Sequence, residues 1–300
     1  MIARLAGLAA AVVLTAGCMR HHTGPMPGEP ADATYAQIQG ARIRYTDEGK
    51  GPAIVLIHGF ASSLETWQDV APAIAATGHR VVTLDLKGFG WSDRPEGDYS
   101  PTMQGRLVFA LLDELGIDQA SIVAHSWGSS VALAMALEHP ERVNKIALYD
   151  AWVFEEQLPT TFLWARTPGV GEAIFATFYN QRFEDKLATA YYDPTQISQD
   201  RVDEVEAKQR RPGSRAAALA AVRGQRYGEY QERYRDIEKP VLLLWGREDE
   251  ITYLEDGERL ASMLPEAQMR VYPRCGHFPM IEAKAASTRD LVRFLNAEAK

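Results

Sequence analysis

Hydrophobic and polar positions divide the chain into short apolar runs and longer amphipathic stretches. The apolar runs have the length of buried strands and end in glycine or polar residues. They cover residues 54–57, 81–84, 122–124, 145–149, 241–245 and, more weakly, 269–272. Residues 35–39 and 41–46 instead indicate an antiparallel pair that turns at Gly40. Because helical stretches separate the later runs, we expect a mainly parallel sheet with helices on both faces.

The strand pattern fades between residues 152 and 236, where helical signals replace it. Candidate helices cover residues 164–182, 202–211 and 216–234, and proline-containing dipeptides interrupt the segment. It is rich in aromatic residues, which either helix packing or the wall of an apolar pocket would explain. These aromatic residues are Trp152, Phe154, Phe162, Trp164, Phe175, Phe178 and Tyr179. We expect residues 152–236 to form a helical cap on a core made of residues 35–151 and 237–300.

Two local signals predict where helices of the core begin. Ser62 and Glu65 have the spacing of a capping box, in which each side chain satisfies a backbone N–H of the other. Ser100 followed by Pro101 is the usual form of an N-cap with proline at the first helical position.

Composition and charge narrow the class of protein. The 300 residues are 46% apolar, enough for the core of one domain with an insertion. The formal net charge is −8 and no basic cluster offsets it, so the electrostatics do not favour a nucleic-acid partner. Oligomeric state cannot be read from this pattern.

The first residues have the form of a signal peptide. Residues 1–17 contain one early charge and an apolar stretch that is too short to span a bilayer. Residues 15–18 resemble the bacterial lipobox, which implies that Cys18 becomes a lipidated N-terminus. The expected membrane partner is then the bacterial cell envelope, the outer membrane rather than the inner, with residues 18–34 as a flexible tether. An ordinary secretory signal with an incidental cysteine is the alternative.

The strand at residues 122–124 leads directly into Ser126 and an Ala/Leu-rich helix. A serine between small residues at such a strand-to-helix turn is the sequence form of a nucleophile elbow. The turn is tight, so Ala124 and Gly128 have the sizes that the geometry requires. The helix N-terminus would favour negative charge that develops beside the serine.

Two later strand ends supply an acid and a base. Asp249 follows the run 241–245, and His277 follows the strand at 269–272. The carboxyl ends of parallel strands lie at one edge of the sheet, so these residues can meet Ser126. Asp150, at the end of the strand 145–149, is the alternative acid. We favour Asp249, in its Trp-Gly-x-x-Asp setting.

These motifs resemble the α/β-hydrolase superfamily from about residue 35 to the C-terminus. The likeness includes His58-Gly59-Phe60, the run Asp85 to Asp93, and Gly276-His277-Phe278-Pro279 with Glu282. It implies an eight-stranded, mainly parallel sheet with a cap inserted after the sixth strand. It also implies that Ser126 is the nucleophile, His277 the general base and acid, and Asp249 the group that orients the imidazole. The backbone N–H groups of Phe60 and Trp127 would form the oxyanion hole.

The expected reaction follows from the nucleophile. His125-Ser126-Trp127-Gly128 resembles the His-Asp-Trp-Gly of epoxide hydrolases and haloalkane dehalogenases, but a serine does not run their alkyl-ester chemistry efficiently. We therefore expect hydrolysis of carboxylic esters of small or medium acyl substrates through an acyl-enzyme, with no metal or organic cofactor. Amide hydrolysis resembling proline iminopeptidases or C–C bond hydrolysis of meta-cleavage products is the alternative. A ligand-binding pseudo-hydrolase is the non-enzyme alternative. An amide hydrolase would need a cap carboxylate to hold an ammonium group, for which the candidates are Glu155, Glu156, Glu184 and Asp185.

Overall fold

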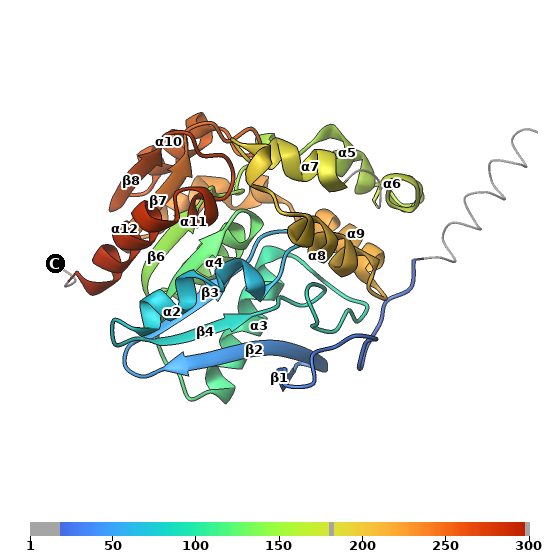
Figure 1. Cartoon of the computed structure of the whole chain (residues 1–300), viewed down its shortest axis with the longest axis horizontal. Helices are drawn as coiled ribbons and strands as arrows, with labels where there is room; N and C mark the ends of the chain where they lie inside the picture. The colour runs from blue at the N-terminus through green and yellow to red at the C-terminus, as the bar shows by residue number, and fades with distance from the viewer. Residues whose placement is uncertain (1–18, 180–182, 298–300) are drawn as a thin grey trace, which may run out of the picture.

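The structure is a computed structural model that describes residues 19–179 and 183–297. Within these residues one sheet has the strand order β1-β2-β4-β3-β5-β6-β7-β8 (Figure 1). The strands are β1 (Thr34–Ile38), β2 (Ala41–Gly49), β3 (Ala53–Ile57), β4 (Arg80–Leu84), β5 (Ala120–His125), β6 (Val143–Tyr149), β7 (Val241–Gly246) and β8 (Ala267–Tyr272). β2 runs antiparallel to both β1 and β4, and the other neighbouring strands are parallel. The predicted eight-stranded, mainly parallel sheet is therefore confirmed.

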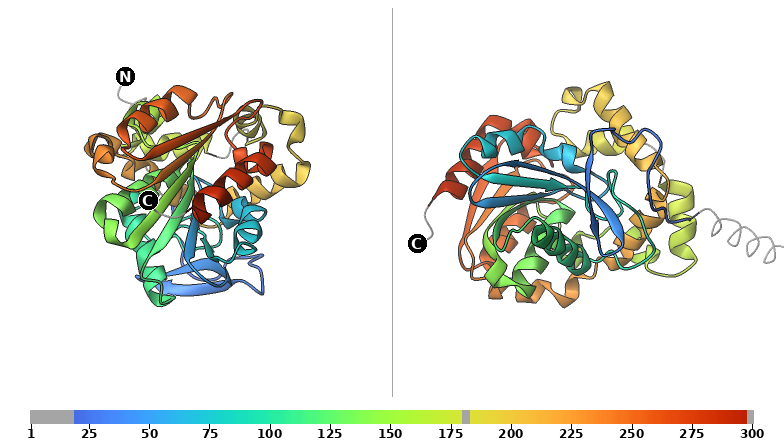
Figure 2. Two further views of the ribbon diagram at one scale, coloured as in Figure 1. Left: turned by 90° about the vertical axis from the view of Figure 1, so that its left-hand side faces the viewer. Right: turned by 90° about the horizontal axis from the view of Figure 1, so that it is seen from below.

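Helices cover both faces of the sheet (Figure 2). On one face lie α2 (Val70–Ala75), α11 (Pro279–Glu282) and α12 (Lys284–Asn296), and on the other lie α3 (Pro101–Glu114), α4 (Trp127–Glu138) and α10 (Leu254–Met263). The side chains of β3 alternate between two separate apolar clusters. Val55 and Ile57 join the cluster with α3 and α4, whereas Ile54 and Leu56 join the cluster with α2 and α12. Burial on both faces explains why this strand is continuously apolar in the sequence.

The segment 152–236 consists of helices and loops in its described residues. Its elements are η3 (Glu155–Gln157), α5 (Thr160–Ala165), α6 (Val170–Phe178), α7 (Phe183–Ala190), η4 (Pro194–Gln196), α8 (Gln199–Arg210), α9 (Ser214–Gly224), η5 (Tyr227–Glu229) and η6 (Gln231–Asp236). The single helix predicted for residues 164–182 is wrong, because the chain turns at Gly169, which has φ 82°. The helix predicted for 216–234 is also too long: α9 ends at Gly224, and short 3₁₀ turns follow.

One of the two predicted helix starts is confirmed. Ser100 caps α3, since its Oγ accepts a hydrogen bond from Met103 N–H at 3.3 Å. The capping box at Ser62 is wrong. That segment forms only the 3₁₀ turn η1 (Leu64–Trp67), and the Glu65 carboxylate instead accepts a hydrogen bond from Arg44 at 2.5 Å. A tertiary ion pair thus takes the carboxylate that the local motif would have used. A second 3₁₀ turn, η2 (Pro140–Arg142), precedes β6.

The N-terminal segment packs on the core from Met19 onward, which differs from the flexible tether that we predicted. His22 and Arg94 exchange two backbone hydrogen bonds of 2.9 and 2.7 Å as an isolated antiparallel bridge. Met26 is buried, and Glu29 forms an ion pair of 2.6 Å with Arg42. These long-range contacts order a segment whose glycines and prolines indicate no regular element. Cys18 and the predicted signal peptide lie outside the described residues, within which no helix has the length and apolarity to cross a membrane.

Candidate active site

Ser126 lies at a strained turn between β5 and α4. Its backbone has φ 52° and ψ −125°, a conformation that non-glycine residues rarely adopt. The backbone N–H of Ser126 donates to Tyr149 O on the neighbouring strand at 2.9 Å, which holds the turn in place. A Cβ atom on Gly128 would lie 2.5 Å from the His58 carbonyl oxygen, so only glycine fits at this position. The elbow geometry thus explains the small residue two positions after the serine.

The structure brings together the three side chains that the sequence singled out. His277 Nε2 lies 2.9 Å from Ser126 Oγ, and His277 Nδ1 lies 2.7 Å from Asp249 Oδ2. All three follow the carboxyl ends of parallel strands β5, β7 and β8, which meet at one edge of the sheet. Because Nδ1–H donates to Asp249, Nε2 is free to accept the serine proton.

Asp249 is held as an anion by several donors. Besides His277, it accepts hydrogen bonds from Ile251 N–H at 2.7 Å, Thr252 N–H at 3.1 Å and Thr252 Oγ1–H at 2.6 Å. Burial by itself would raise the pKa of Asp249. The facing His277 and the hydrogen bonds from Thr252 and Ile251 outweigh burial, so the pKa lies below its usual value.

Asp150, the alternative acid, lies next to this triad and has different partners. It is fully buried after β6, and its Oδ1 accepts a hydrogen bond from Gly246 N–H at 2.8 Å. Burial and the negative charge of Asp249 raise the pKa of Asp150 well above its usual value. Of the two acids, Asp249 therefore faces His277 as the anion and has the hydrogen bond to its Nδ1.

The same carboxyl groups and His277 are the described residues whose spacing most resembles a cation site. One carboxylate oxygen from each of Asp150 and Asp249 and one ring nitrogen of His277 lie within 4.8 Å of one another. Both ring nitrogens of His277 already bond Ser126 and Asp249. A metal ion here would have to break the hydrogen bonds that align the triad, so the donor set fits acid–base chemistry better than metal binding.

The backbone amides that we expected to form the oxyanion hole belong to Phe60, in the loop after β3, and to Trp127, the first residue of α4. Neither Phe60 N–H nor Trp127 N–H donates to another group within the described chain. The His58 ring holds the loop after β3 through two hydrogen bonds. Its Nε2 accepts from Leu86 N–H at 3.0 Å, so the ring proton is on Nδ1, which donates to Gly59 O at 2.7 Å. Burial lowers the pKa of His58, which keeps the ring neutral in this arrangement.

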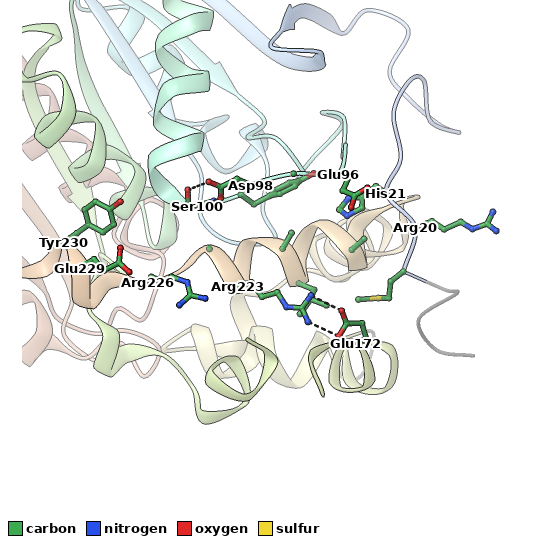
Figure 3. A pocket seen from close by; sticks show the side chains of 17 residues that line it. Arg20, His21, Glu96, Asp98, Ser100, Glu172, Arg223, Arg226, Glu229 and Tyr230 are labelled. Carbon is green, nitrogen blue, oxygen red and sulfur yellow. Dashed lines mark hydrogen bonds and ion pairs between the residues drawn. The ribbon is translucent and has the colours of Figure 1, made fainter. Parts of the chain in front are cut away.

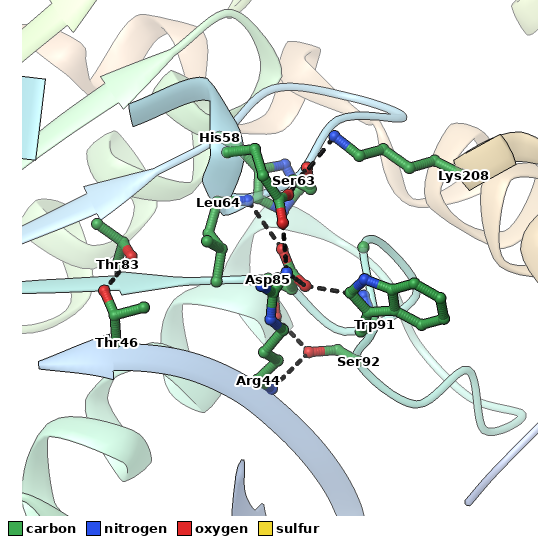
Figure 4. Close-up of polar contacts among 12 residues, drawn as sticks. Arg44, Thr46, His58, Ser63, Leu64, Thr83, Asp85, Trp91, Ser92 and Lys208 are labelled. Carbon is green, nitrogen blue, oxygen red and sulfur yellow. Dashed lines mark hydrogen bonds and ion pairs between the residues drawn. The ribbon is translucent and has the colours of Figure 1, made fainter. Parts of the chain in front are cut away.

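Asp85, to which we assigned no role from the sequence, is fully buried after β4 and lies beside His58 (Figure 4). Figure 4 shows it between Arg44, Leu64 and Trp91. Its carboxylate oxygens accept hydrogen bonds of 2.8 Å from the backbone N–H groups of Leu64 and Trp91. A Cβ on Gly90 would lie 2.0 Å from the Asp85 carboxyl carbon, so the glycine allows the loop to wrap around the acid. The sequence does not show that Asp85 is fully buried or which groups donate hydrogen bonds to it, so its role could not be predicted.

A cavity of about 830 Å³ lies between the cap and the loops that carry the triad. Phe60, Ile251 and Phe278, neighbours of the triad and of the oxyanion loop, contribute to its wall. Four of the aromatic cap residues line it, namely Trp152, Phe162, Phe175 and Tyr179. Phe154 is buried against Tyr234, whereas Trp164 is 59% exposed, so these two are not pocket wall. The side chain of Phe178 lies outside the described part of the structure.

Two cations from α8 also line this cavity. Arg201 forms an ion pair of 3.0 Å with Glu204, and Lys208 forms one of 2.5 Å with the same carboxylate. Lys208 also reaches the core, where its Nζ lies 3.5 Å from Glu65 Oε2. The polar part of the pocket is therefore a network of paired charges that joins the cap to the core.

Two of the four cap carboxylates that we considered for an amide hydrolase pair with arginines. Glu155 pairs with Arg166 at 2.5 Å, and Glu156 pairs with Arg259 at 3.3 Å. The side chains of Glu184 and Asp185 lie outside the described residues.

A second cavity, of about 930 Å³, lies between the N-terminal segment and α9 (Figure 3). Its wall includes Met19 and Arg20 but neither a residue of the triad nor a sequence neighbour of one. Arg223, which faces it, is paired with Glu172 at 2.9 Å. The wall of the cap–core cavity instead includes Glu250 and Phe278, the sequence neighbours of Asp249 and His277, so we take that cavity as the candidate site.

Residues 52–284 match the alpha/beta hydrolase fold family. The chain belongs to this family. It is 31% identical over 268 residues to a 2-hydroxy-6-oxononadienedioate/2-hydroxy-6-oxononatrienedioate hydrolase of Cupriavidus pinatubonensis, across 85% of this chain and 90% of that protein. This hydrolase-fold chain is accordingly a hydrolase.

Solved structures of hydrolases also resemble this chain over most of its length. A meta-cleavage product hydrolase from Pseudomonas fluorescens IP01 superposes with a TM-score of 0.75 and 27% identity, across 88% of this chain and 97% of the other. An N-acyl homoserine lactone degrading enzyme superposes with a TM-score of 0.72 and 26% identity, across 87% and 100%. The likeness therefore extends over nearly the whole of both relatives.

Proposed function

We propose that this hydrolase cleaves a carbon–carbon bond next to a ketone in 2-hydroxy-6-oxo-dienoate compounds, with Ser126 as nucleophile. The observation that supports this choice is the long alignment with a hydrolase named for such a compound. It favours the C–C alternative over the carboxylic ester reaction that we first expected. The aligned triad, with hydrogen bonds of 2.9 and 2.7 Å, supplies the groups that either reaction needs.

In this reaction Ser126 Oγ attacks the ketone carbon as His277 Nε2 takes the hydroxyl proton. Asp249 stabilises the imidazolium that forms, and the N–H groups of Phe60 and Trp127 stabilise the oxyanion. Cleavage proceeds from the 2-oxo tautomer of the substrate, formed when the 2-hydroxyl proton moves to the carbon next to the ketone. The C–C bond to that carbon then breaks, its electron pair is delocalised onto the 2-oxo group as a dienolate, and the dienolate oxygen receives the proton from His277. Water activated by His277 hydrolyses the acyl-enzyme. The leaving carbon needs the conjugated carbonyl because an isolated carbanion would be far too basic to leave.

The pocket has features that suit such a substrate. Its aromatic and aliphatic walls fit the diene, and Arg201 and Lys208 offer positive charge to the carboxylate end. Glu204 pairs with both cations, so a substrate carboxylate would compete with the Glu204 carboxylate for them.

Ester or lactone hydrolysis is the second candidate. Each cation of the pocket is paired with a carboxylate, and much of the wall is apolar, an arrangement that also suits a neutral acyl group. The 26% identity to an N-acyl homoserine lactone degrading enzyme favours the same reaction.

A substrate panel separates these candidates. We expect the visible absorbance of 2-hydroxy-6-oxononadienedioate to fall in the presence of the enzyme, with kcat/KM well above the value for p-nitrophenyl acyl esters and N-acyl homoserine lactones. Ser126→Ala is the matched control and should abolish every activity. Faster turnover of the neutral esters would contradict C–C bond cleavage as the main reaction and support ester or lactone hydrolysis. Absence of a fluorophosphonate adduct on Ser126 would instead favour a ligand-binding pseudo-hydrolase.

We propose separately that Cys18 carries a lipid that anchors the enzyme to the bacterial cell envelope, with the outer membrane favoured. The proposal is supported by the lipobox-like residues 15–18. Because the chain packs on the core from Met19 onward, a lipid at Cys18 would hold the enzyme close to the bilayer. Labelling with a fatty-acid analogue tests this: label should appear on the native protein and be lost in Cys18→Ser. Label that persists in that variant would refute the anchor.

A further inference from the structure

Asp150 is a fully buried carboxyl group that the proposed reaction does not use. It follows β6 with φ 44°, and only its Oδ1 has a donor, the N–H of Gly246. Its Oδ2 is buried and has no hydrogen-bond partner in the described part of the chain. A buried carboxylate oxygen without a donor is strongly disfavoured, whereas a protonated carboxyl brings its own O–H.

The neighbours of Asp150 decide which of two acids holds the proton. An oxygen of Asp249 and a ring nitrogen of His277 lie within 4.8 Å of a carboxyl oxygen of Asp150. Asp249 accepts hydrogen bonds from Ile251, Thr252 and His277, whereas Asp150 accepts one. Two carboxyl groups this close do not both ionise readily, so the negative charge belongs on the one with more donors.

We propose that Asp150 is a positioning residue that stays protonated, so that Asp249 is the anion that faces His277. When Asp249 is neutralised, Asp150 ionises and replaces Asp249 as that anion. The kinetic consequences rest on the proposed serine-hydrolase function, but the protonation does not. In Asp249→Asn the like charge is gone, so Asp150 can release its proton to solvent without any other covalent change. Its carboxylate then lies close enough to stabilise the His277 imidazolium.

Burial and nearby charges together raise the pKa of Asp150. Burial has the largest effect, the negative charge of Asp249 has the next largest, and the charge of Glu282 in α11 raises this pKa further. The thiol of Cys275 and the hydroxyl of Tyr149 also lie near it, and their own pKa values are raised by burial. These two groups stay neutral at ordinary pH, so within the described structure Asp249, Glu282 and His277 are the charges that matter.

Three variants test the replacement of one acid by the other. Asp150→Asn, an isostere of the protonated acid, should lower kcat by no more than about threefold, because its amide can make the same hydrogen bonds. Asp249→Asn should lose about 10²-fold rather than the roughly 10⁴-fold seen when a triad aspartate has no substitute. The double variant should show the full loss of about 10⁴-fold. Equal activities of Asp249→Asn and the double variant would overturn the proposal.

The pH dependence adds a readout that a purely structural role would not change. In Asp249→Asn the working form requires ionised Asp150, whose pKa burial keeps high. Its rate should therefore be retained at alkaline pH and be lost as pH falls, at a higher pH than in the native enzyme. The double variant should lack this added acid limb. A pH profile of Asp249→Asn that coincides with the native one would contradict the proposal.

A spectroscopic measurement does not depend on turnover. The infrared carbonyl band of a buried protonated carboxyl group should be present in the native protein at neutral pH and absent in Asp150→Asn. Asp32→Asn, at an exposed acid that precedes β1, is the matched control and should leave the band in place. Loss of catalysis on every substrate with the band intact would refute the proposed function alone, whereas a missing band would refute the inference about Asp150.

Discussion

The ion pair between Lys208 of the cap and Glu65 of the core makes stability depend on pH. Glu65 also pairs with Arg44 at 2.5 Å. Burial by itself would raise the pKa of Glu65, but the charge of Lys208 and the hydrogen bonds from Ser63 and Arg44 lower it from 4.5 to about 2. A tenfold change in an acid constant corresponds to about 1.4 kcal/mol, so ionised Glu65 contributes about 3 kcal/mol to the free energy of unfolding at neutral pH.

The sign follows from the lowered pKa. The stabilisation is fully present above pH 4.5, where the carboxyl group is ionised even in the unfolded chain, and it declines as pH falls toward 2. Glu65→Gln should therefore lower the free energy of unfolding by about 3 kcal/mol at neutral pH, but by only about 1.4 kcal/mol near pH 3.

Urea unfolding, followed by circular dichroism at the two pH values, measures this difference. Glu232→Gln is the matched control because its ion pair with Arg235 is exposed, and it should change stability by less than about 0.5 kcal/mol. A loss in Glu65→Gln that is the same at both pH values, or that equals the control, would refute the reasoning.

Three further changes test other parts of the site. Gly128→Ala should cost about 1–3 kcal/mol in urea unfolding because its Cβ would meet a backbone carbonyl at 2.5 Å, whereas Gly228→Ala, with nothing within 4 Å, should be nearly neutral. Thr252→Val removes a donor to Asp249, which should raise the pKa of that carboxyl and move the acid limb of the pH–rate profile to higher pH. Lys208→Met should raise KM for the dicarboxylate substrate at least about tenfold and change KM for neutral esters much less; equal effects would contradict a role for Lys208 in anion binding.

The elbow that carries Ser126 was predictable because it is a local feature of the sequence. Ser126 lies in a strand-to-helix turn whose small residues are close in sequence. The contact that requires glycine at position 128, however, is with the backbone of His58 after β3. The acid was not predictable to the same degree. Asp150 and Asp249 both follow apolar strands, and only the hydrogen bonds at their oxygens distinguish the one that faces His277.

Predictions that used only neighbouring residues failed where distant partners compete for the same groups. The Ser62–Glu65 capping box is absent because Arg44 and Lys208 bind the carboxylate. The N-terminal segment packs on the core because Arg94 and Arg42 offer it partners from other parts of the chain.

Apolar runs, turn residues and the elbow determine the order of strands and helices and the class of nucleophile, since each depends on residues within a few positions of one another. The folded chain alone decides which acid is ionised, which charges line the pocket and where residues 19–33 lie. Those outcomes depend on burial and on the distances between groups far apart in sequence, and both arise only when the sheet brings its strand ends together.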